Sequence, residues 1–150
     1  MFAYHIGQEK LEEVAPSNPE FKAFYDAKMA QNGFIASVFE GTAPEGSKEA
    51  IFAKSQKLWL DISTFLATNL AGYLPSNGGF IGGENASEDD FHLGAWLARI
   101  GAIAQASNDA SGIDAIGKKV GQTIPEPVRA YWAHWVSRPS WGEVYAKGLH

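Results

Sequence analysis

Apolar residues recur every three or four positions along most of this chain, which is the spacing of helices with one buried face. The strongest repeat consists of Ile51, Phe52, Leu58, Trp59, Ile62, Phe65, Leu66 and Leu70. Weaker stripes of the same kind lie on either side of it. Together the stripes predict five helices, at about 19–40, 47–73, 87–107, 113–120 and 128–136.

Glycine and proline separate these segments. Residues 41–46 and 74–86 are rich in both and predict loops. Pro139 predicts a stop after the last helix, followed by an apolar tail. No run alternates between apolar and polar residues over the length of a strand. The fold class is therefore predicted to be all-α, with a polar lead-in over 1–19 and one helical domain over 20–150.

The sharpest local motif opens the predicted helix at 87. Ser87 at the N-cap can accept from the Asp90 amide, and the Asp90 carboxylate can reach back to the Ser87 amide, which makes a capping box. A rival interpretation is an acid–base or metal cluster of Glu88, Asp89 and Asp90 with His92. Helix starts carry such acids because of the helix dipole, so capping is the favoured hypothesis.

Two sets of glycines suggest close packing. The segment 78–83, GGFIGG, lacks the lysine and hydroxyl residue of a phosphate-binding loop and is followed by acids that repel phosphate. We interpret it as a tight turn that lets Phe80 and Ile81 dock into the core. Gly94 and Gly101 lie inside a predicted helix and indicate that another helix approaches there.

Composition excludes several function classes. The 150 residues carry a formal net charge of −5, which disfavours binding to nucleic acid or to an anionic membrane surface. There is no cysteine, so disulfides, thiol catalysis and zinc–thiolate sites are excluded. No histidine pair has the i, i+4 spacing of a helical metal site, and we expect no metal and no cofactor.

Three segments carry a resemblance to one family. The run GGFIGGENASEDDFHLGAWLARI, which ends at Ile100, resembles the loop and central helix in the C-terminal domain of fungal glutathione transferase-like proteins. The segments KMAQNGFIASVFEGTA and AYWAHWVSRPSWGEVYAKGLH resemble the first helix and the end of the same domain. The resemblance covers about residues 20–150.

This resemblance implies a bundle of about five helices in a cytoplasmic protein that tends to form dimers. It also implies a function: the helical domain lines the pocket for an apolar electrophile, while a thioredoxin-like domain binds the co-substrate glutathione. By position in the family, the pocket residues would be Phe21, Phe24, Tyr25, Lys28, Met29, Asn32, Trp132 and Trp141.

The family's thioredoxin-like segment has no counterpart before residue 20. We therefore expect no catalytic residue in this chain and no glutathione-conjugating activity from it alone. The expected partner is a thioredoxin-like domain or a second copy of the chain. The alternative hypothesis is a non-catalytic module that binds a protein or an apolar small molecule. The tryptophans Trp132 and Trp141 can also be explained as core anchors.

Overall fold

The structure of the protein is a computed structural model that describes residues 11–106 and 110–149. Its secondary structure is helical, and within those ranges the only extended pairing is a single bridge between Phe80 and Gly83. The all-α prediction is therefore confirmed. Of the predicted lead-in, residues 1–10 lie outside the described residues.

Contacts divide the chain into two compact units, residues 1–55 and 56–150. The predicted boundary after residue 19 is a statement about domains, which these contacts do not test, so it stays a prediction. The first unit holds two short 3-10 turns, Ala15–Ser17 and Pro19–Phe21, and the helix α2 over Lys22–Glu40. Gly41 ends α2 in the left-handed region with φ +75°, which explains the glycine at this position.

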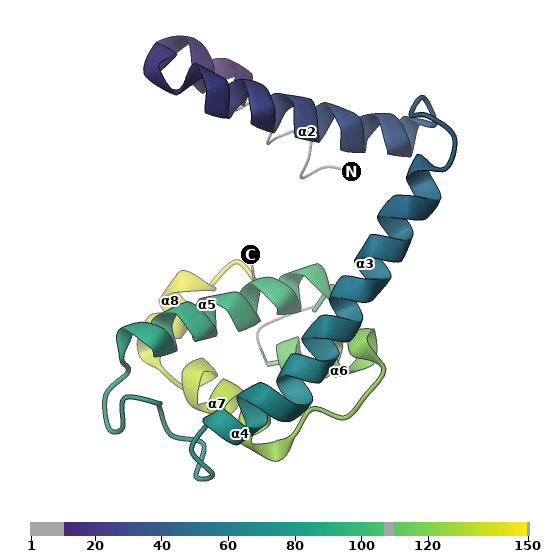
Figure 1. Cartoon of the computed structure of the whole chain (residues 1–150). Coiled ribbons are helices and arrows are strands. Elements are labelled where there is room, and N and C mark those ends of the chain that lie inside the picture. Colours follow the sequence, from purple (N-terminus) through teal and green to yellow (C-terminus); the bar gives the residue numbers. More distant parts are fainter. Residues whose placement is uncertain (1–10, 107–109, 150) are drawn as a thin grey trace. The chain divides into compact units, whose positions relative to one another are not determined.

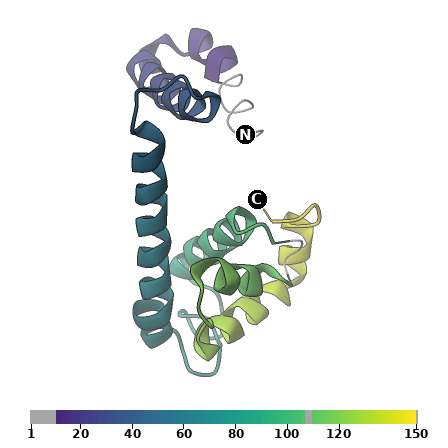
Figure 2. The same cartoon turned by 90° about the vertical axis from the view of Figure 1, so that its right-hand side faces the viewer.

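The predicted second helix is one helical stretch with a change of type inside it. It runs as α3 (Ser47–Thr64), a π-helical segment (Phe65–Leu70) and α4 (Ala71–Tyr73). Figure 2 shows this stretch, coloured teal, as one continuous coiled ribbon. The bounds match the predicted 47–73, whereas the wider π turns carry no signal in the apolar spacing.

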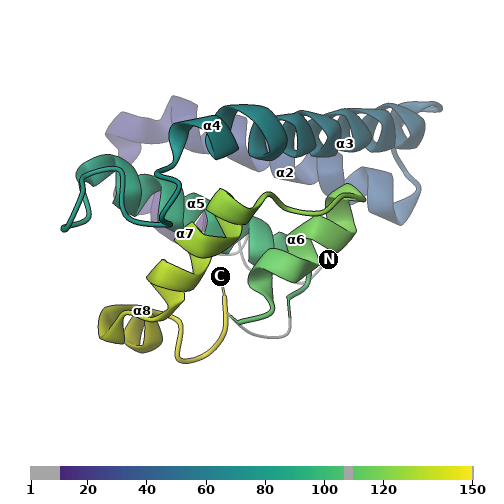
Figure 3. The same ribbon diagram turned by 90° about the horizontal axis from the view of Figure 1, so that it is seen from below.

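Among its described residues the second unit contains four further helices, labelled in Figure 1: α5 (Glu88–Ile103), α6 (Gly112–Val120), α7 (Glu126–Val136) and α8 (Pro139–Val144). Helix α5 contacts both α6 and α7, and α7 also contacts α4 and α8. Figure 3 shows α6 and α7 with the loop that joins them. Aromatic and branched side chains fill the space between these elements.

The core of the second unit is rich in aromatic residues. Fully or almost fully buried are Leu66, Leu70, Leu74, Phe80, Leu97, Ala98, Ile100, Ile113, Ile116, Ile124, Val128, Tyr131, Trp132, Trp135 and Trp141. Phe80 docks into this core as predicted, at 2% exposure, and Ile81 is half-buried beside it.

Glycines let these helices approach closely. A Cβ on Gly94 would lie 2.8 Å from the Trp135 ring of α7. A Cβ on Gly101 would lie 3.5 Å from the Gly112 Cα of α6. The prediction that another helix approaches at both glycines of α5 is confirmed.

One predicted helix end was wrong, and one short helix was missed. The predicted end near 107 lies outside the described residues, but α5 already ends at Ile103, and Gln105 follows with φ +63°. Pro139 does not merely stop α7, which ends at Val136, because it also begins α8. Proline is well suited to the first turn of a helix, where its missing N–H costs nothing.

No helix in the described ranges is long and apolar enough to cross a bilayer.

Candidate functional site

The capping box predicted at the start of α5 is present. The Ser87 backbone N–H donates to Asp90 Oδ2 at 2.9 Å, and the Asp90 N–H donates to Ser87 Oγ at 3.4 Å. The Ser87 hydroxyl also donates to Asp90 Oδ2 at 2.7 Å. Capping, rather than a carboxylate cluster facing solvent, therefore explains this motif.

The Asp90 carboxylate does more than cap its helix. It accepts from the backbone N–H groups of Ile81 at 2.8 Å and Gly82 at 3.0 Å, which fixes the glycine loop against α5. The Tyr131 hydroxyl of α7 lies 3.0 Å from Asp90 Oδ1. Asp90 is fully buried. One carboxylate thus joins a loop, a helix start and a second helix.

These contacts also set the ionisation of Asp90. Burial alone raises the pKa of Asp90, but the hydrogen bonds from Ser87, Gly82 and Ile81 outweigh it and hold that pKa below the ordinary 3.8. Burial raises the pKa of Tyr131 well above 10, and the adjacent Asp90 adds to this rise. Asp90 is therefore an ionised structural acceptor, and its acceptor positions are occupied by groups of the protein.

The remaining members of the acidic cluster do not join it. Glu88 and His92 lie one helical turn apart on the surface of α5, with 3.6 Å between Glu88 Oε1 and His92 Nε2, and both side chains are largely exposed. No three His, Asp or Glu side chains in the described ranges converge as metal ligands would.

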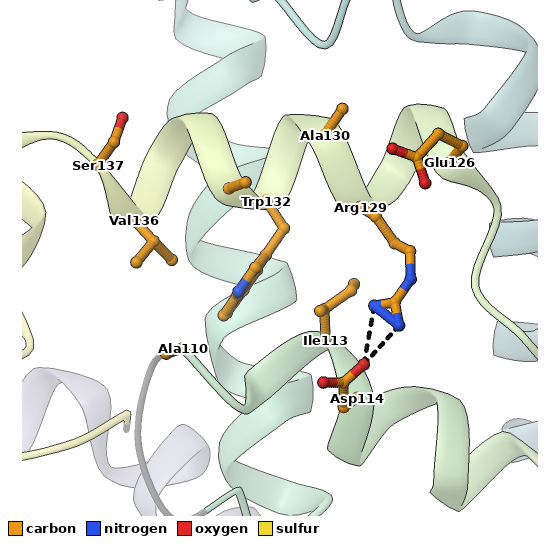
Figure 4. Close-up of a pocket in the computed structure, with 10 residues that line it drawn as sticks. Ala110, Ile113, Asp114, Glu126, Arg129, Ala130, Trp132, Val136 and Ser137 are labelled. Atoms are coloured by element: carbon orange, nitrogen blue, oxygen red, sulfur yellow. Dashed lines mark hydrogen bonds and ion pairs between the residues drawn. The ribbon is translucent and has the colours of Figure 1, made fainter.

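A pocket of about 550 Å³ lies between α6 and α7 (Figure 4). It is lined by Ala110, Ile113, Asp114, Glu126, Arg129, Ala130, Trp132, Ala133, Val136 and Ser137. Figure 4 shows the Trp132 ring extending from α7 toward α6, on the same side as Ile113. The volume falls within the range of roughly 300–1,000 Å³ that is usual for small-molecule pockets.

The rim of this pocket is charged. Arg129 Nη1 and Nη2 donate to Asp114 Oδ1 at 2.8 and 2.5 Å, which links α7 to α6. The Asp114 side chain is 66% exposed, so this pair adds little to stability. The pair joins the two helices that form the pocket, and both residues line it.

The structure places the six predicted pocket residues of the first helix in the first unit. Phe21 ends the 3-10 turn that precedes α2, and the others lie on α2 itself. Phe24 packs edge-on against Tyr25 with 5.5 Å between ring centroids, and Lys28 Nζ lies 5.9 Å from the Phe24 centroid. Phe21, Phe24 and Lys28 are exposed, while Tyr25, Met29 and Asn32 are half-buried.

The other two predicted pocket residues lie in the second unit. The rings of Trp132 and Trp141 contact each other edge-on, with centroids 5.3 Å apart, and both side chains are buried. Trp132 lines the α6–α7 pocket, whereas Trp141 is a core residue that does not. Whether the α2 residues share a pocket with the tryptophans stays a prediction, because the two groups belong to different units.

Sequence reasoning missed most of the α6–α7 pocket. Arg129, Ala133 and Val136 recur at helical spacing beside Trp132, and this was a usable signal for one wall. The opposite wall, Ile113 and Asp114, comes from another helix, and no local pattern connects it to α7.

Comparisons of the chain with models of known protein families, with curated proteins and with solved structures found no match.

Proposed function

We propose that this chain is a non-catalytic binding module that takes an apolar small molecule in the α6–α7 pocket. The observation that carries the proposal is the pocket itself, about 550 Å³ with mainly apolar lining and the edge of Trp132 in its wall. Burial of apolar ligand surface against alanine, valine and tryptophan side chains supplies the affinity. The Asp114–Arg129 pair orients any polar end of the ligand at the rim.

The state of the carboxylates supports a binding role over catalysis. Asp90, the most buried acid, has its oxygens occupied by five protein donors, so it cannot exchange protons with a substrate without breaking the fold. Asp114 is held by Arg129. The two hydroxyls beside Asp90, those of Ser87 and Tyr131, donate to its carboxylate within the capping box and the α5–α7 contact, and neither residue lines the α6–α7 pocket.

Filling the pocket tests this proposal. We expect the exposed Ala133→Phe change to leave the fold intact and to reduce binding of a neutral fluorescent probe, N-phenyl-1-naphthylamine, about tenfold or more, since the added ring occupies the ligand's space. The readout is a fluorescence titration. The matched control is Ala146→Phe, the same change at an exposed position outside the lining. Equal affinity in both variants would refute the pocket as the binding site.

A second proposal follows from the resemblance: the chain is the helical half of a cytoplasmic, dimeric glutathione transferase-like protein, with a bundle of the family's C-terminal type. It is supported by the buried capping box at the start of α5 and by the order of five main helices in the described residues. In that setting a thioredoxin-like domain would bind glutathione. The electrophile pocket would be lined by Phe21, by Phe24, Tyr25, Lys28, Met29 and Asn32 of α2, and by Trp132 and Trp141.

Supplying a thioredoxin-like partner domain tests this second proposal. We expect the chain alone to conjugate glutathione to an aromatic halide no faster than the uncatalysed reaction, because the resemblance assigns the group that stabilises the thiolate to the thioredoxin-like domain. Addition of a thioredoxin-like domain of this family, fused or in trans, is expected to give saturable turnover. Turnover by the pure chain, or none after complementation, would contradict the proposal.

A further inference from the structure

A second cleft, of about 570 Å³, lies apart from the α6–α7 pocket and is lined by two aromatic rings and one acid among its five residues. It is lined by Phe65, Asp89, His92, Leu93 and Trp96. The last four recur at i, i+3, i+4 and i+7 on one face of α5, and Phe65 comes from the π-helical segment. All five belong to the second unit.

The two rings form a corner. Phe65 and Trp96 meet at 86°, with 5.4 Å between ring centroids, and each remains more than a third exposed. Aromatic side chains of this size are usually buried further. By contrast Leu66, the next residue in the chain, is fully buried in the core. The corner therefore leaves aromatic surface available to a ligand.

The helix that supplies Phe65 is irregular at this point. A π-helical segment interrupts the regular hydrogen-bond ladder, and such segments occur frequently at functional sites. Two side chains stabilise the junction: Gln122 Nε2 donates to the Ser63 carbonyl at 2.7 Å, and the Thr68 hydroxyl donates to the Thr64 carbonyl at 2.7 Å. The irregularity is thus supported by specific contacts, one of which comes from 59 residues away.

Charge selects the class of ligand. Asp89 forms no ion pair and no hydrogen bond through its side chain within the described ranges, so its carboxylate is available at the rim of the cleft. His92 Nε2 lies 3.6 Å from the Glu88 carboxylate, which adds a second negative group beside the cleft. No lysine or arginine lines the cleft, and the whole chain carries a net charge of −5. An anion is disfavoured here and a cation is favoured.

We propose that this cleft binds an organic cation, an ammonium group carried on an aromatic or alkyl body. The ammonium group lies against the Trp96 face, where the ring quadrupole attracts it, and near the Asp89 carboxylate. The apolar body packs on Phe65 and Leu93. This site is separate from the α6–α7 pocket, and the inference does not depend on the function proposed for that pocket.

The test is a calorimetric titration of the full chain with benzyltrimethylammonium, with benzyl alcohol as the neutral probe and benzenesulfonate as the anionic one. We expect saturable binding in the order cation, neutral, anion. Asp89→Asn is expected to weaken binding of the cation roughly threefold to tenfold, and Trp96→Leu by a similar factor, the range of a partly exposed cation–π or charge contact. Both variants are checked for native circular dichroism.

The matched control is Glu143→Gln, which changes the net charge by the same unit at an exposed position of α8 outside the cleft. It should leave the affinity for the cation unchanged. An equal loss in Asp89→Asn and Glu143→Gln would show that only overall charge matters and would overturn the site. So would a failure of the cation to bind, or tighter binding of benzenesulfonate. If Trp96→Leu does not fold, the comparison of Asp89→Asn with Glu143→Gln decides.

Discussion

Asp90→Asn is expected to lower the free energy of unfolding by about 2–4 kcal/mol, since each hydrogen-bond donor that loses its acceptor costs about 1–3 kcal/mol. The amide has the size of the carboxylate but replaces one acceptor oxygen by an NH₂ group. In either orientation this NH₂ faces a backbone N–H, of Ile81 on one side or of Gly82 and Ser87 on the other. The loop and the helix start would then lose their common anchor.

Chemical denaturation followed by far-ultraviolet circular dichroism measures this effect. The matched control is Asp89→Asn, the same chemical change at the neighbouring exposed acid in the first turn of α5. It loses only a favourable interaction with the helix dipole, worth about 0.3–1 kcal/mol. If both variants unfold at the same denaturant midpoint, Asp90 is merely one more first-turn acid and the anchoring role is wrong.

We also expect the effect of Asp90→Asn on the free energy of unfolding to depend on pH. Because the pKa of Asp90 in the folded state lies below the ordinary 3.8, folding favours the ionised carboxylate. This contribution to stability is complete above the unfolded-state pKa and is lost as pH falls through the lower folded-state pKa. The difference in free energy of unfolding between wild type and Asp90→Asn should therefore be constant near neutral pH and narrow below pH 3.8. A difference that stays constant into that acidic range would contradict the role of the charge.

Which of the hydrogen bonds to Asp90 could be predicted depended on how far each partner lies from Asp90 in the sequence. Ser87 and Asp90 are three residues apart, so the geometry of a helix start dictates their contact, and the capping box was predicted from the sequence. The bonds to Ile81 and Gly82 depend on how the loop folds back. The bond from Tyr131 spans 41 residues and depends on the packing of α7 against α5. The central role of Asp90 in the core was therefore visible only in the structure.

The helices themselves were largely predictable, because apolar spacing reports directly which face is buried. Prediction of the secondary structure failed where one residue type is typical of both the end and the start of a helix. Pro139 both prevents a helix from continuing and favours the start of the next, and the sequence pattern alone did not decide between these. The π turns at Phe65 change the helix by a fraction of a turn, which is too little to disturb a pattern of apolar positions.

The candidate sites were less predictable than the fold. Trp132 lines the α6–α7 pocket and is also a buried core residue, whereas its place in the electrophile pocket that the resemblance implies stays a prediction. Trp141 is buried in the core and does not line the α6–α7 pocket, and its place in the electrophile pocket likewise stays a prediction. A pocket requires two walls, and the sequence indicates each wall only as an apolar helix face. Which faces are left partly uncovered depends on tertiary packing.

Gly94→Ala is expected to destabilise the protein by about 1–3 kcal/mol, the usual cost of overpacking a core. The added Cβ would lie 2.8 Å from Cε2 and 3.0 Å from Nε1 of Trp135, atoms of a rigid ring that is itself 5% exposed. Alanine is a better helix former than glycine by about 1 kcal/mol, but this gain is offset because α5 and α7 must move apart.

Gly72→Ala is the matched control for Gly94→Ala, because the same chemical change is expected to stabilise the protein at this position. Gly72 lies in α4, and a Cβ there would meet nothing within 4 Å, so only the gain in helix propensity remains. We expect this variant to be more stable than wild type by about 0.5–1 kcal/mol. The denaturant midpoints of Gly94→Ala and Gly72→Ala should therefore shift in opposite directions.

A double-mutant cycle tests the contact directly. Trp135→Phe should reduce the loss of stability caused by Gly94→Ala, because the smaller ring makes room for the methyl group. A Gly94→Ala variant that is stabilised like Gly72→Ala would mean that α5 and α7 do not pack as closely as the contact between Gly94 and Trp135 requires.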